Sequence, residues 1–203
     1  MDLYLYENEL YLSGITYIGG VDEVGRGPLI GPVVAACVVL PRGFLLDGLT
    51  DSKKLSEKKR DLFYPYIIKH ALAYGIGIVV PEEIDKINIY QASKQAMIIA
   101  IKEVQTKLPL EHVLIDAMPL VLNIPSTSII KGDSKSISIA AASVVAKVTR
   151  DQMMYELDKK YPLYGYGHHK GYPTKKHLAA INLYGLIPGY RQTYRPISDY
   201  LKR

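Results

Sequence analysis

Apolar residues recur along the chain in short, nearly continuous runs that predict five strands of a covered sheet. Glycines interrupt some of these runs, which permits close packing against neighbouring elements. The predicted strands span residues 14–23, 31–40, 71–80, 112–117 and 127–133. Three early strands followed by strand–helix units imply an α/β fold with a mixed sheet flanked by helices. The first strands supply the antiparallel pairs, and the later crossover connections supply the parallel ones.

Helical patterns separate and follow these strands. After a short N-terminal helix or arm, the predicted helices span residues 57–70, 89–108, 136–162 and 175–186. Ser56 is placed to cap the first of these helices, whereas Pro65 should kink or shorten it. The alanine run 140–142 lets the third helix approach a sheet closely.

Length, charge and composition narrow the classes of protein. A chain of 203 residues suits one domain, residues 1–203, in which the helical and loop region from about 160 onward forms a subregion. The net charge of +5 permits an anionic partner such as nucleic acid. The single cysteine, Cys37, excludes an internal disulfide. Without a signal-peptide pattern or an apolar run of about 20 residues, we expect a cytoplasmic protein with no membrane partner, and nothing requires more than a monomer.

Four acidic residues stand at or just beyond the ends of predicted strands. Asp22 and Glu23 close the first strand. Asp116 ends the apolar run 112–116, and Asp133 follows another apolar run before the alanine-rich helix. Each has an ordinary alternative, namely a solvated pair at a turn, a polar strand end, or a helix cap in the case of Asp133. Together they suggest that three separate strand ends deliver carboxylates to one edge of the sheet.

Such a cluster of acids requires a compensating charge. Neighbouring carboxylates raise one another's pKa, and hard divalent cations relieve that repulsion. Mg²⁺ favours carboxylate oxygens together with the phosphate of a substrate over a cage made by protein alone. Two ions about 3.5–4 Å apart can activate water and stabilise the leaving oxygen during cleavage of a phosphodiester. We therefore predict that Mg²⁺ or Mn²⁺ ions lie between these carboxylates and a nucleic-acid phosphate.

The turn that follows the first acidic pair suits a sugar–phosphate chain. Gly25 and Gly27 let the backbone approach closely, so that its N–H and C=O groups can contact a 2′-hydroxyl. The planar fork of Arg26 can bind phosphate. Lys53 and Lys54, in the loop before the first long helix, can also contact phosphate, although a lysine pair is more often a solvated surface.

A loop rich in tyrosine and glycine, residues 161–174, precedes the last helix. Its aromatic faces can stack on sugars or bases while Lys170 neutralises phosphate. The histidines of this region have no cysteine nearby and fit no standard zinc spacing, so zinc is not predicted. These histidines are His168, His169 and His177.

Several of these motifs, in this order, closely resemble those of bacterial ribonuclease HII. The matching segments cover most of residues 18 to 178. They are GVDEVGRGPLIGPVVAACVVLP, DSKKLSEKKRDLF, ALAYGIGIV, PEEIDKINIYQAS, HVLIDA, KGDSKSISIAAASVVAKVTRD and YGHHKGYPTKKH. The resemblance implies a ribonuclease H-like fold, in which a mixed five-stranded sheet is flanked by helices and followed by a C-terminal helical extension. The related ribonuclease HIII family usually lacks the Gly-Arg-Gly-Pro form of the turn.

The resemblance also implies an activity and its residues. Members of the family cleave RNA within RNA–DNA hybrids and incise ribonucleotide-containing duplex DNA on the 5′ side of a single ribonucleotide. The implied products carry 5′-phosphate and 3′-hydroxyl ends. Carried over to this chain, the family's metal-binding carboxylates are Asp22, Glu23, Asp116 and Asp133.

The same resemblance assigns residues that bind the substrate. The family's element that senses the ribose 2′-hydroxyl corresponds to Gly25, Arg26 and Gly27. The tyrosine that helps to recognise the RNA–DNA junction corresponds to Tyr172. The family also has a loop that contacts phosphate, and the match of Lys53 and Lys54 to that loop is less close.

Two other functions stay open on the sequence alone. A non-catalytic protein could bind hybrid duplexes through the basic loops and tail, with the acids serving a structural role. Another ribonuclease H-like nuclease, such as a DNA resolvase, would share the acids but not the Gly-Arg-Gly-Pro turn. The tail itself could hold duplex phosphates or form an ordinary solvated terminus. Its basic residues are Arg191, Arg195, Lys202 and Arg203.

Overall fold

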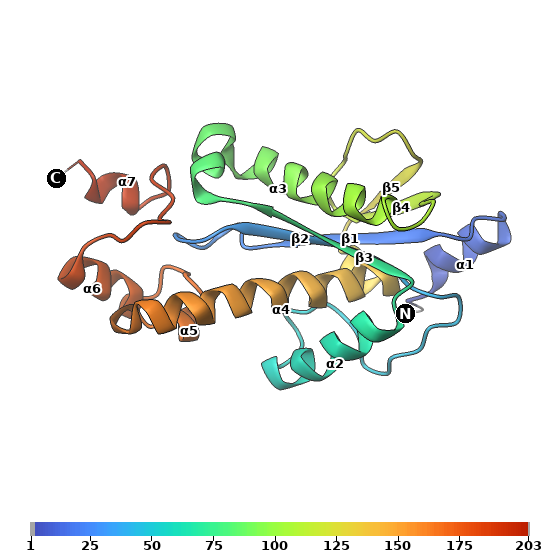
Figure 1. The fold of residues 1–203 in the computed structure, drawn as a ribbon, viewed down its shortest axis with the longest axis horizontal. Coiled ribbons are helices and arrows are strands. Elements are labelled where there is room, and N and C mark those ends of the chain that lie inside the picture. The colour runs from blue at the N-terminus through green and yellow to red at the C-terminus, as the bar shows by residue number, and fades with distance from the viewer. Residues whose placement is uncertain (1–2, 203) are drawn as a thin grey trace.

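A mixed five-stranded sheet forms the centre of the computed structural model, which describes residues 3–202 (Figure 1). Its strands are β1 (Ile18–Val24), β2 (Val33–Val39), β3 (Ala73–Val79), β4 (His112–Asp116) and β5 (Ser126–Ile129). Their spatial order is β3-β2-β1-β4-β5. The first three strands form antiparallel pairs, while β4 pairs in parallel with both β1 and β5. The predicted sheet and the predicted origin of its two kinds of pairing are confirmed.

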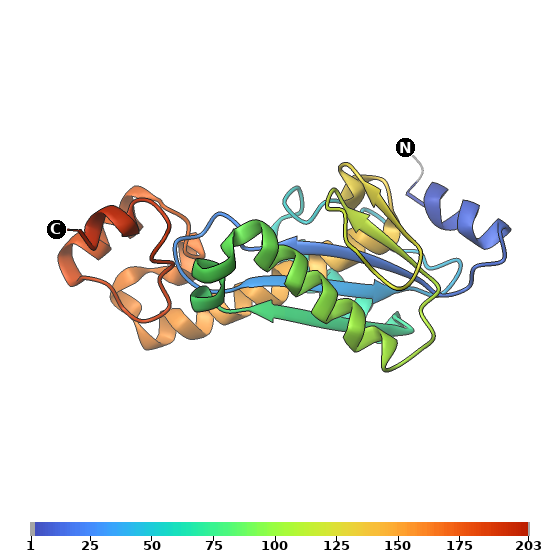
Figure 2. The ribbon, with the colours of Figure 1, turned by 90° about the horizontal axis from the view of Figure 1, so that it is seen from above.

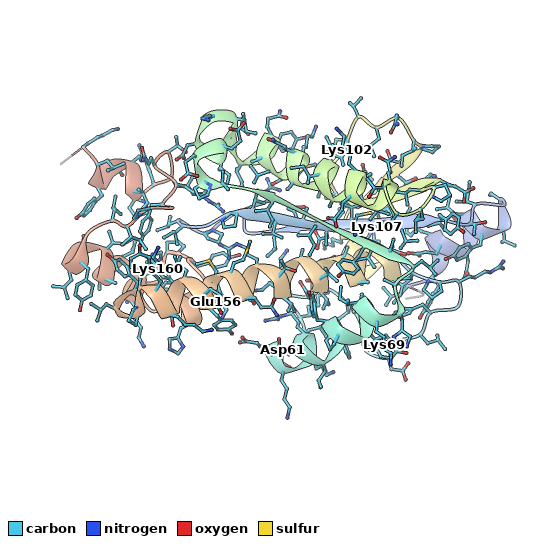
Figure 3. The ribbon with its side chains drawn as sticks, in the orientation of Figure 1. Asp61, Lys69, Lys102, Lys107, Glu156 and Lys160 are labelled. Carbon is cyan, nitrogen blue, oxygen red and sulfur yellow. The ribbon has the colours of Figure 1, made fainter. Side chains whose placement is uncertain are left out.

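Helices cover both faces of the sheet (Figure 1). The helix α3 (Pro81–Gln105) packs on one face, and α4 (Ile137–Lys160) packs on the other with α2 (Glu57–His70) against it. Successive residues of a strand point to opposite faces, so the central strand β2 contributes to both cores. For that reason its sequence, VVAACVV, is apolar and buried at every position. Figure 3 shows charged side chains on the outer faces of the helices, such as Lys102 on α3.

One helix begins earlier than predicted, and another is not shortened by the proline inside it. The helix α3 begins at Pro81 and not at residue 89, because it consists of two helical segments joined at a kink. Asn88 has a φ of 68° at that kink, and its side chain accepts hydrogen bonds from the N–H groups of Tyr90 (3.0 Å) and Gln91 (3.1 Å). The helix α2 runs through Pro65 to His70, so the proline does not shorten it. Ser56 caps α2 as predicted, since its Oγ accepts from the N–H of residue 59 (3.3 Å).

The fifth strand is shorter than predicted, which changes the placement of Asp133. Because β5 ends at Ile129, Asp133 is not at a strand end. It lies in a single turn of 3₁₀ helix, η1 (Gly132–Ser134), which follows Lys131 in a left-handed conformation with φ of 57°. This turn leads the chain from the sheet into α4.

The C-terminal region forms a small helical unit at the end of the molecule opposite α1 (Leu5–Leu12) (Figure 2). The unit contains η2 (Pro162–Tyr164), α5 (Tyr166–His169), α6 (Lys175–Tyr184) and α7 (Ile197–Tyr200). Its tyrosine-rich core also buries Leu29 and Ile30, which follow the Gly-Arg-Gly-Pro turn. The turn after β1 is therefore packed against the C-terminal unit. Within residues 3–202, no helix has the length and apolar character needed to cross a membrane.

Candidate active site

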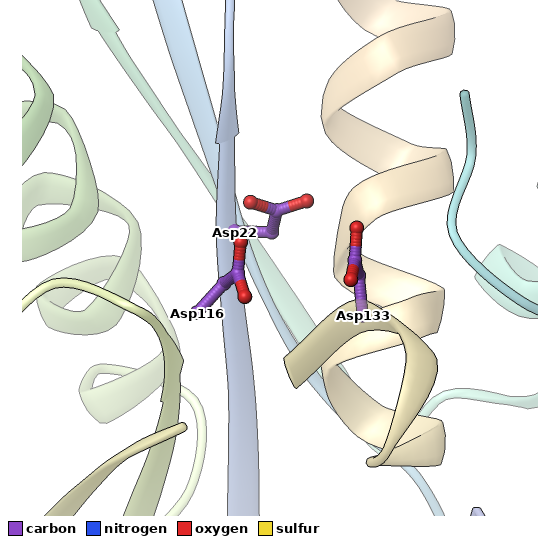
Figure 4. Close-up of side chains that lie close together, drawn as sticks. All are labelled: Asp22, Asp116 and Asp133. Carbon is purple, nitrogen blue, oxygen red and sulfur yellow. The ribbon is translucent and has the colours of Figure 1, made fainter. Parts of the chain in front are cut away.

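Three carboxylates that are far apart in the sequence meet at one place (Figure 4). Asp22, Asp116 and Asp133 each bring one oxygen within 4.8 Å of the others. Asp22 is on β1 and Asp116 ends β4, and these neighbouring strands run parallel, so the two residues lie side by side. The N–H of Gly132 donates to Asp116 Oδ1 (2.7 Å), which fixes the turn that carries Asp133 next to Asp116. Three of the four predicted carboxylates thus form one group.

Asp133 does not cap α4, which was the alternative role for it. The cap is Ser136, whose Oγ accepts from the N–H of Ile139 (3.2 Å). Asp133 is instead buried, with 7% of its surface exposed, in the carboxylate group.

Glu23 lies beside this group but outside it. The strand β1 continues to Val24, so alternation directs Asp22 toward α4 and Glu23 toward the opposite face. The carboxylate of Glu23 forms an ion pair with Arg26 (3.5 Å). Burial raises the pKa of Glu23, Arg26 opposes that shift, and Asp116 adds to it. Glu23 is therefore within electrostatic reach of the group.

The acids are crowded and poorly solvated. Burial raises the pKa of Asp22 well above its usual range, and the charges of Glu23 and Asp116 raise it further. Burial, together with the charges of Asp116 and Asp51, raises the pKa of Asp133 to about 6. Buried carboxylates that repel one another in this way fit a hard divalent cation, because its charge stabilises their ionised form and its preferred ligands are oxygens.

The loop before α2 brings one cation and one further acid to the group. Partial burial by itself would lower the pKa of Lys53, but the charges of nearby acids, Asp22 foremost, raise it. Asp51 forms a side-chain hydrogen bond with Asp133, and its Oδ1 accepts the N–H of Lys53 (2.9 Å). Lys54 is exposed, and its N–H donates to the carbonyl of Asp51 (2.9 Å). The sequence pattern did not indicate a role for Asp51, because this residue lies in a loop outside every predicted strand and helix.

Two serines connect this loop with Asp22. Ser143, on α4, forms a hydrogen bond with the Asp22 side chain, and its Oγ lies 2.8 Å from the Oγ of Ser52. The Ser143 hydroxyl donates to the Oγ of Ser52, and its contact with Asp22 joins the loop to the end of β1 through α4. These hydroxyls orient the Asp22 carboxylate and hold the loop that carries Lys53 close to it.

The Gly-Arg-Gly turn lies directly under Tyr172. Gly25 has a φ of 94°, a conformation that residues with a Cβ rarely adopt. A Cβ added at Gly27 would lie 3.1 Å from the ring of Tyr172, so the tyrosine packs closely over the turn. Tyr172 is 42% exposed, so a ligand can reach it. The structure thus brings together two predicted substrate-binding elements from opposite ends of the chain.

A buried arginine holds the turn in shape. Arg191 is fully buried, and its guanidinium donates to the carbonyls of Gly25 (2.5 Å) and Arg26 (2.9 Å). It also donates to the carbonyl of Gly31 (2.9 Å), beyond the turn. The expectation that Arg191 contacts duplex phosphates or lies in a solvated tail is therefore wrong. The sequence could not reveal this, because the contact requires the C-terminal segment to return beside β1.

The rest of the basic tail lies elsewhere. Arg195 and Lys202 are exposed, so both remain available for phosphates. Arg203 lies outside the described residues.

A second buried arginine, Arg150 on α4, supports the segment after the turn. Its guanidinium donates to the carbonyls of Ile30 (3.2 Å) and Pro32 (3.0 Å). It also donates to the carbonyl of Lys170 (3.0 Å), two residues before Tyr172. Arg150 therefore joins the turn segment to the tyrosine loop, a role that the helical pattern around it does not indicate.

The backbone of Tyr172 is held by a buried chain of hydrogen bonds. Its carbonyl can only accept, so the Nδ1 of His177 carries the proton in that contact (2.9 Å). The Nε2 of His177 then accepts from the hydroxyl of Tyr190 (2.8 Å), which in turn accepts from that of Tyr166 (2.9 Å). Burial lowers the pKa of His177 to about 4, so the ring is neutral near pH 7. His169 stacks on it at 4.3 Å, and both histidines support the tyrosine loop.

The chain is similar to ribonucleases of type HII over nearly its whole length. The family model for Ribonuclease HII matches residues 19–197. Ribonuclease HII of Bacillus mycoides (strain KBAB4) is 57% identical over 203 residues, which cover 100% of this chain and 78% of that protein. The crystal structure of ribonuclease H2 from Pyrococcus horikoshii OT3 has a TM-score of 0.78 and 26% identity, and the match covers 92% of this chain and 98% of that one. Bst-RNase HIII, solved in complex with Mn²⁺, shows the same fold with a TM-score of 0.71 at 18% identity, over 100% of this chain and 73% of that one.

Proposed function

This chain belongs to the ribonuclease HII family and is a metal-dependent ribonuclease H, and on that premise we propose that it cuts nucleic-acid duplexes at ribonucleotides. It hydrolyses the RNA strand of RNA–DNA hybrids and incises duplex DNA on the 5′ side of a single embedded ribonucleotide, leaving 5′-phosphate and 3′-hydroxyl ends. The observation that supports this most directly is the group formed by Asp22, Asp116 and Asp133. The family membership argues against the non-catalytic alternative.

The carboxylates are the residues that would hold Mg²⁺ or Mn²⁺. Asp22, Asp116 and Asp133 offer converging oxygens, and Glu23 would complete the set from the opposite face of β1. When bound, a pair of such ions activates water for attack and stabilises the leaving 3′-oxygen. The chain itself keeps the ligands in place, because the N–H of Gly132 fixes the Asp116 carboxylate and a serine hydroxyl orients that of Asp22.

The Gly-Arg-Gly turn would recognise the ribose. Arg191 occupies one lone pair on the carbonyl of Gly25, which retains a second lone pair for a 2′-hydroxyl. The carbonyl of Arg26 already accepts from both Arg191 (2.9 Å) and the Tyr194 hydroxyl (2.9 Å). The N–H groups of the same turn can donate to that hydroxyl, which binds as a partner and is not consumed as the nucleophile. Tyr172, packed over Gly27 and partly exposed, would stack on the adjoining sugar or base.

Basic side chains around the site would hold the phosphates. Arg26 is exposed beside Glu23, and its guanidinium can form two parallel hydrogen bonds to a phosphate. Lys53 lies close to the carboxylates, whereas Lys54 points to solvent at the edge of the same loop. These cations would place the scissile phosphate between the turn and the acids.

A nicking assay tests the proposal. With Mg²⁺ present, a duplex that contains one ribonucleotide should be cut once on its 5′ side, and mapped ends should be a 3′-hydroxyl and a 5′-phosphate. An all-DNA duplex is the matched control and should stay intact. Equal cutting of both duplexes, or cutting that persists in excess chelator, would refute the proposed activity.

Two variants separate this function from its alternatives. Asp116→Asn should abolish cutting while the protein still binds the duplex, because the substitution removes a metal ligand and a negative charge. An unchanged cutting rate would show that the carboxylate group is not the active site. Arg26→Ala should weaken cutting of the ribonucleotide duplex, whereas a ribonuclease H-like resolvase would not depend on this turn.

A further inference from the structure

Glu7 is a buried acid that lies outside the candidate active site. It is the buried residue of α1, with 1% of its surface exposed. Its Oε1 accepts hydrogen bonds from the Ser136 hydroxyl (2.5 Å) and from the N–H of Ser138 (3.0 Å). These contacts join the N-terminal helix to the start of α4, although the two segments are far apart in the sequence.

Residues in and just before α1 accept hydrogen bonds from N–H groups at the start of α4. The first N–H groups of a helix have no partner within it. The N–H of Ile137 donates to the carbonyl of Leu3 (2.8 Å). The N–H of Ser138 donates to Glu7, and the next one donates to the capping hydroxyl of Ser136. Two of these three donors therefore depend on α1 and the residues just before it.

The same helix end holds the turn that carries Asp133. The N–H of Ser136 donates to the carbonyl of Gly132 (2.8 Å), and the N–H of Gly132 donates to Asp116 Oδ1 (2.7 Å). Asp133 follows Gly132 directly, so its turn is fixed by Asp116 on one side and by the start of α4 on the other. Continuous hydrogen bonds thus lead from Glu7 through Ser136 and Gly132 to a carboxylate of the group.

The start of α4 also touches the strand that carries Asp22. A Cβ added at Gly20 would lie 2.0 Å from the carbonyl carbon of Ser138, so β1 and α4 meet here without an intervening side chain. Gly20 precedes Asp22 by two residues and faces the same side of β1. A shift of this helix end would therefore move Asp133 relative to both Asp22 and Asp116.

We propose that Glu7 is a positioning residue for the metal-binding carboxylates, acting through the N-terminus of α4. The inference rests on the proposed function, because it takes Asp133 and Asp116 as metal ligands. A negative charge also complements the dipole at a helix N-terminus. Yet Glu7 is a costly choice for stability alone, since its Oε2 is buried without a hydrogen-bond partner among the described residues. A role in geometry accounts for a carboxylate at this position.

The size of the effect follows from where Glu7 acts. Removing a group that orients a metal ligand lowers metal affinity by about 10- to 100-fold. Glu7 acts through an intervening serine, so Glu7→Ala should lie at the lower end, about tenfold. Glu7→Gln keeps an oxygen acceptor but loses the charge at the helix terminus. Its metal affinity should therefore fall by about two- to fivefold.

Isothermal titration calorimetry of the substrate-free protein with Mn²⁺ tests the inference. The Mn²⁺ dissociation constant should rise in Glu7→Ala and, by less, in Glu7→Gln. Glu9→Ala is the matched control, because Glu9 is an exposed acid on the same helix, and its constant should equal that of the unmodified protein. In the nicking assay, the Mg²⁺ concentration for half-maximal rate should shift by the same factors, while the rate at saturating Mg²⁺ recovers.

Unchanged Mn²⁺ affinity in folded Glu7→Ala would overturn the inference. If that variant does not fold, Ser136→Gly removes the hydroxyl that meets Glu7 while keeping an acceptable helix cap. Wild-type affinity in folded Ser136→Gly would then overturn it. Failure of the proposed metal site looks different, because in that case the unmodified protein and Asp116→Asn would take up Mn²⁺ equally or not at all.

Discussion

Replacing Arg191 by lysine tests how the Gly-Arg-Gly turn is built. Arg191→Lys keeps the positive charge but replaces a planar fork of donors by a single ammonium group. The arginine serves the carbonyls of Gly25, Arg26 and Gly31, and of these Arg26 also accepts from the Tyr194 hydroxyl (2.9 Å). The lysine side chain is shorter, and its ammonium group cannot donate to the carbonyls of both Gly25 and Gly31 at once.

The cost can be worked out from these contacts. A buried acceptor left without a donor costs about 1–3 kcal/mol, so the loss at one or two carbonyls is about 1–6 kcal/mol. We expect about 3 kcal/mol, near the middle of that range, because the variant also loses charge-assisted bonds. A loss of this size is a large share of the roughly 5–15 kcal/mol by which domains are stable.

Equilibrium unfolding in urea measures this loss. Arg191→Lys should lower the unfolding midpoint with an unchanged slope. Arg195→Lys is the matched control, because the Arg195 side chain is 85% exposed on the same segment, and its stability should change by less than about 0.5 kcal/mol. Cutting at a single ribonucleotide should fall in folded Arg191→Lys, while its Mn²⁺ affinity stays near that of the unmodified protein. A stability loss below about 1 kcal/mol would refute the reasoning, since no buried carbonyl would then have lost its donor.

Three further changes test other parts of the structure. Gly20→Ala should destabilise the protein by more than about 4 kcal/mol, or prevent folding, because its Cβ would lie 2.0 Å from the backbone of Ser138. A urea midpoint close to that of the unmodified protein would contradict this close contact. Gly27→Ala should change stability little, because the neighbouring Tyr172 ring can shift, but it should raise the KM for a ribonucleotide-containing duplex in steady-state assays. An unchanged KM would show that the Tyr172 ring takes no part in substrate recognition. Burial lowers the pKa of His177 to about 4 from an unfolded value near 6.5, so its contribution to stability is complete above pH 6.5 and is lost as the pH falls toward 4. His177→Gln should therefore flatten the fall in urea midpoint between pH 7 and pH 4.5, and an equally steep fall in the variant would assign the effect to another group.

Several features could be predicted because they depend on short-range order. Runs of β-branched and apolar residues predicted all five strands, and the helical pattern around residues 136–162 predicted α4. Asp22 and Asp116 could be recognised as candidates because each charge interrupts or ends an apolar run. The helix start at residue 89 was wrong because the pattern did not reveal a kink at Asn88.

The sheet, most of the helices and the acids at the strand ends could be predicted, since these depend on the spacing of neighbouring residues. The way in which those acids are held depends on packing between distant segments. The contacts of Glu7 with Ser136 and of Arg191 with Gly25 join segments that are 129 and 166 residues apart. Such hydrogen bonds produce no periodicity in either segment, because their geometry exists only after the sheet and α4 have packed together. The same physical reason explains why Asp133 reaches the carboxylate group from a 3₁₀ turn and not from a strand end.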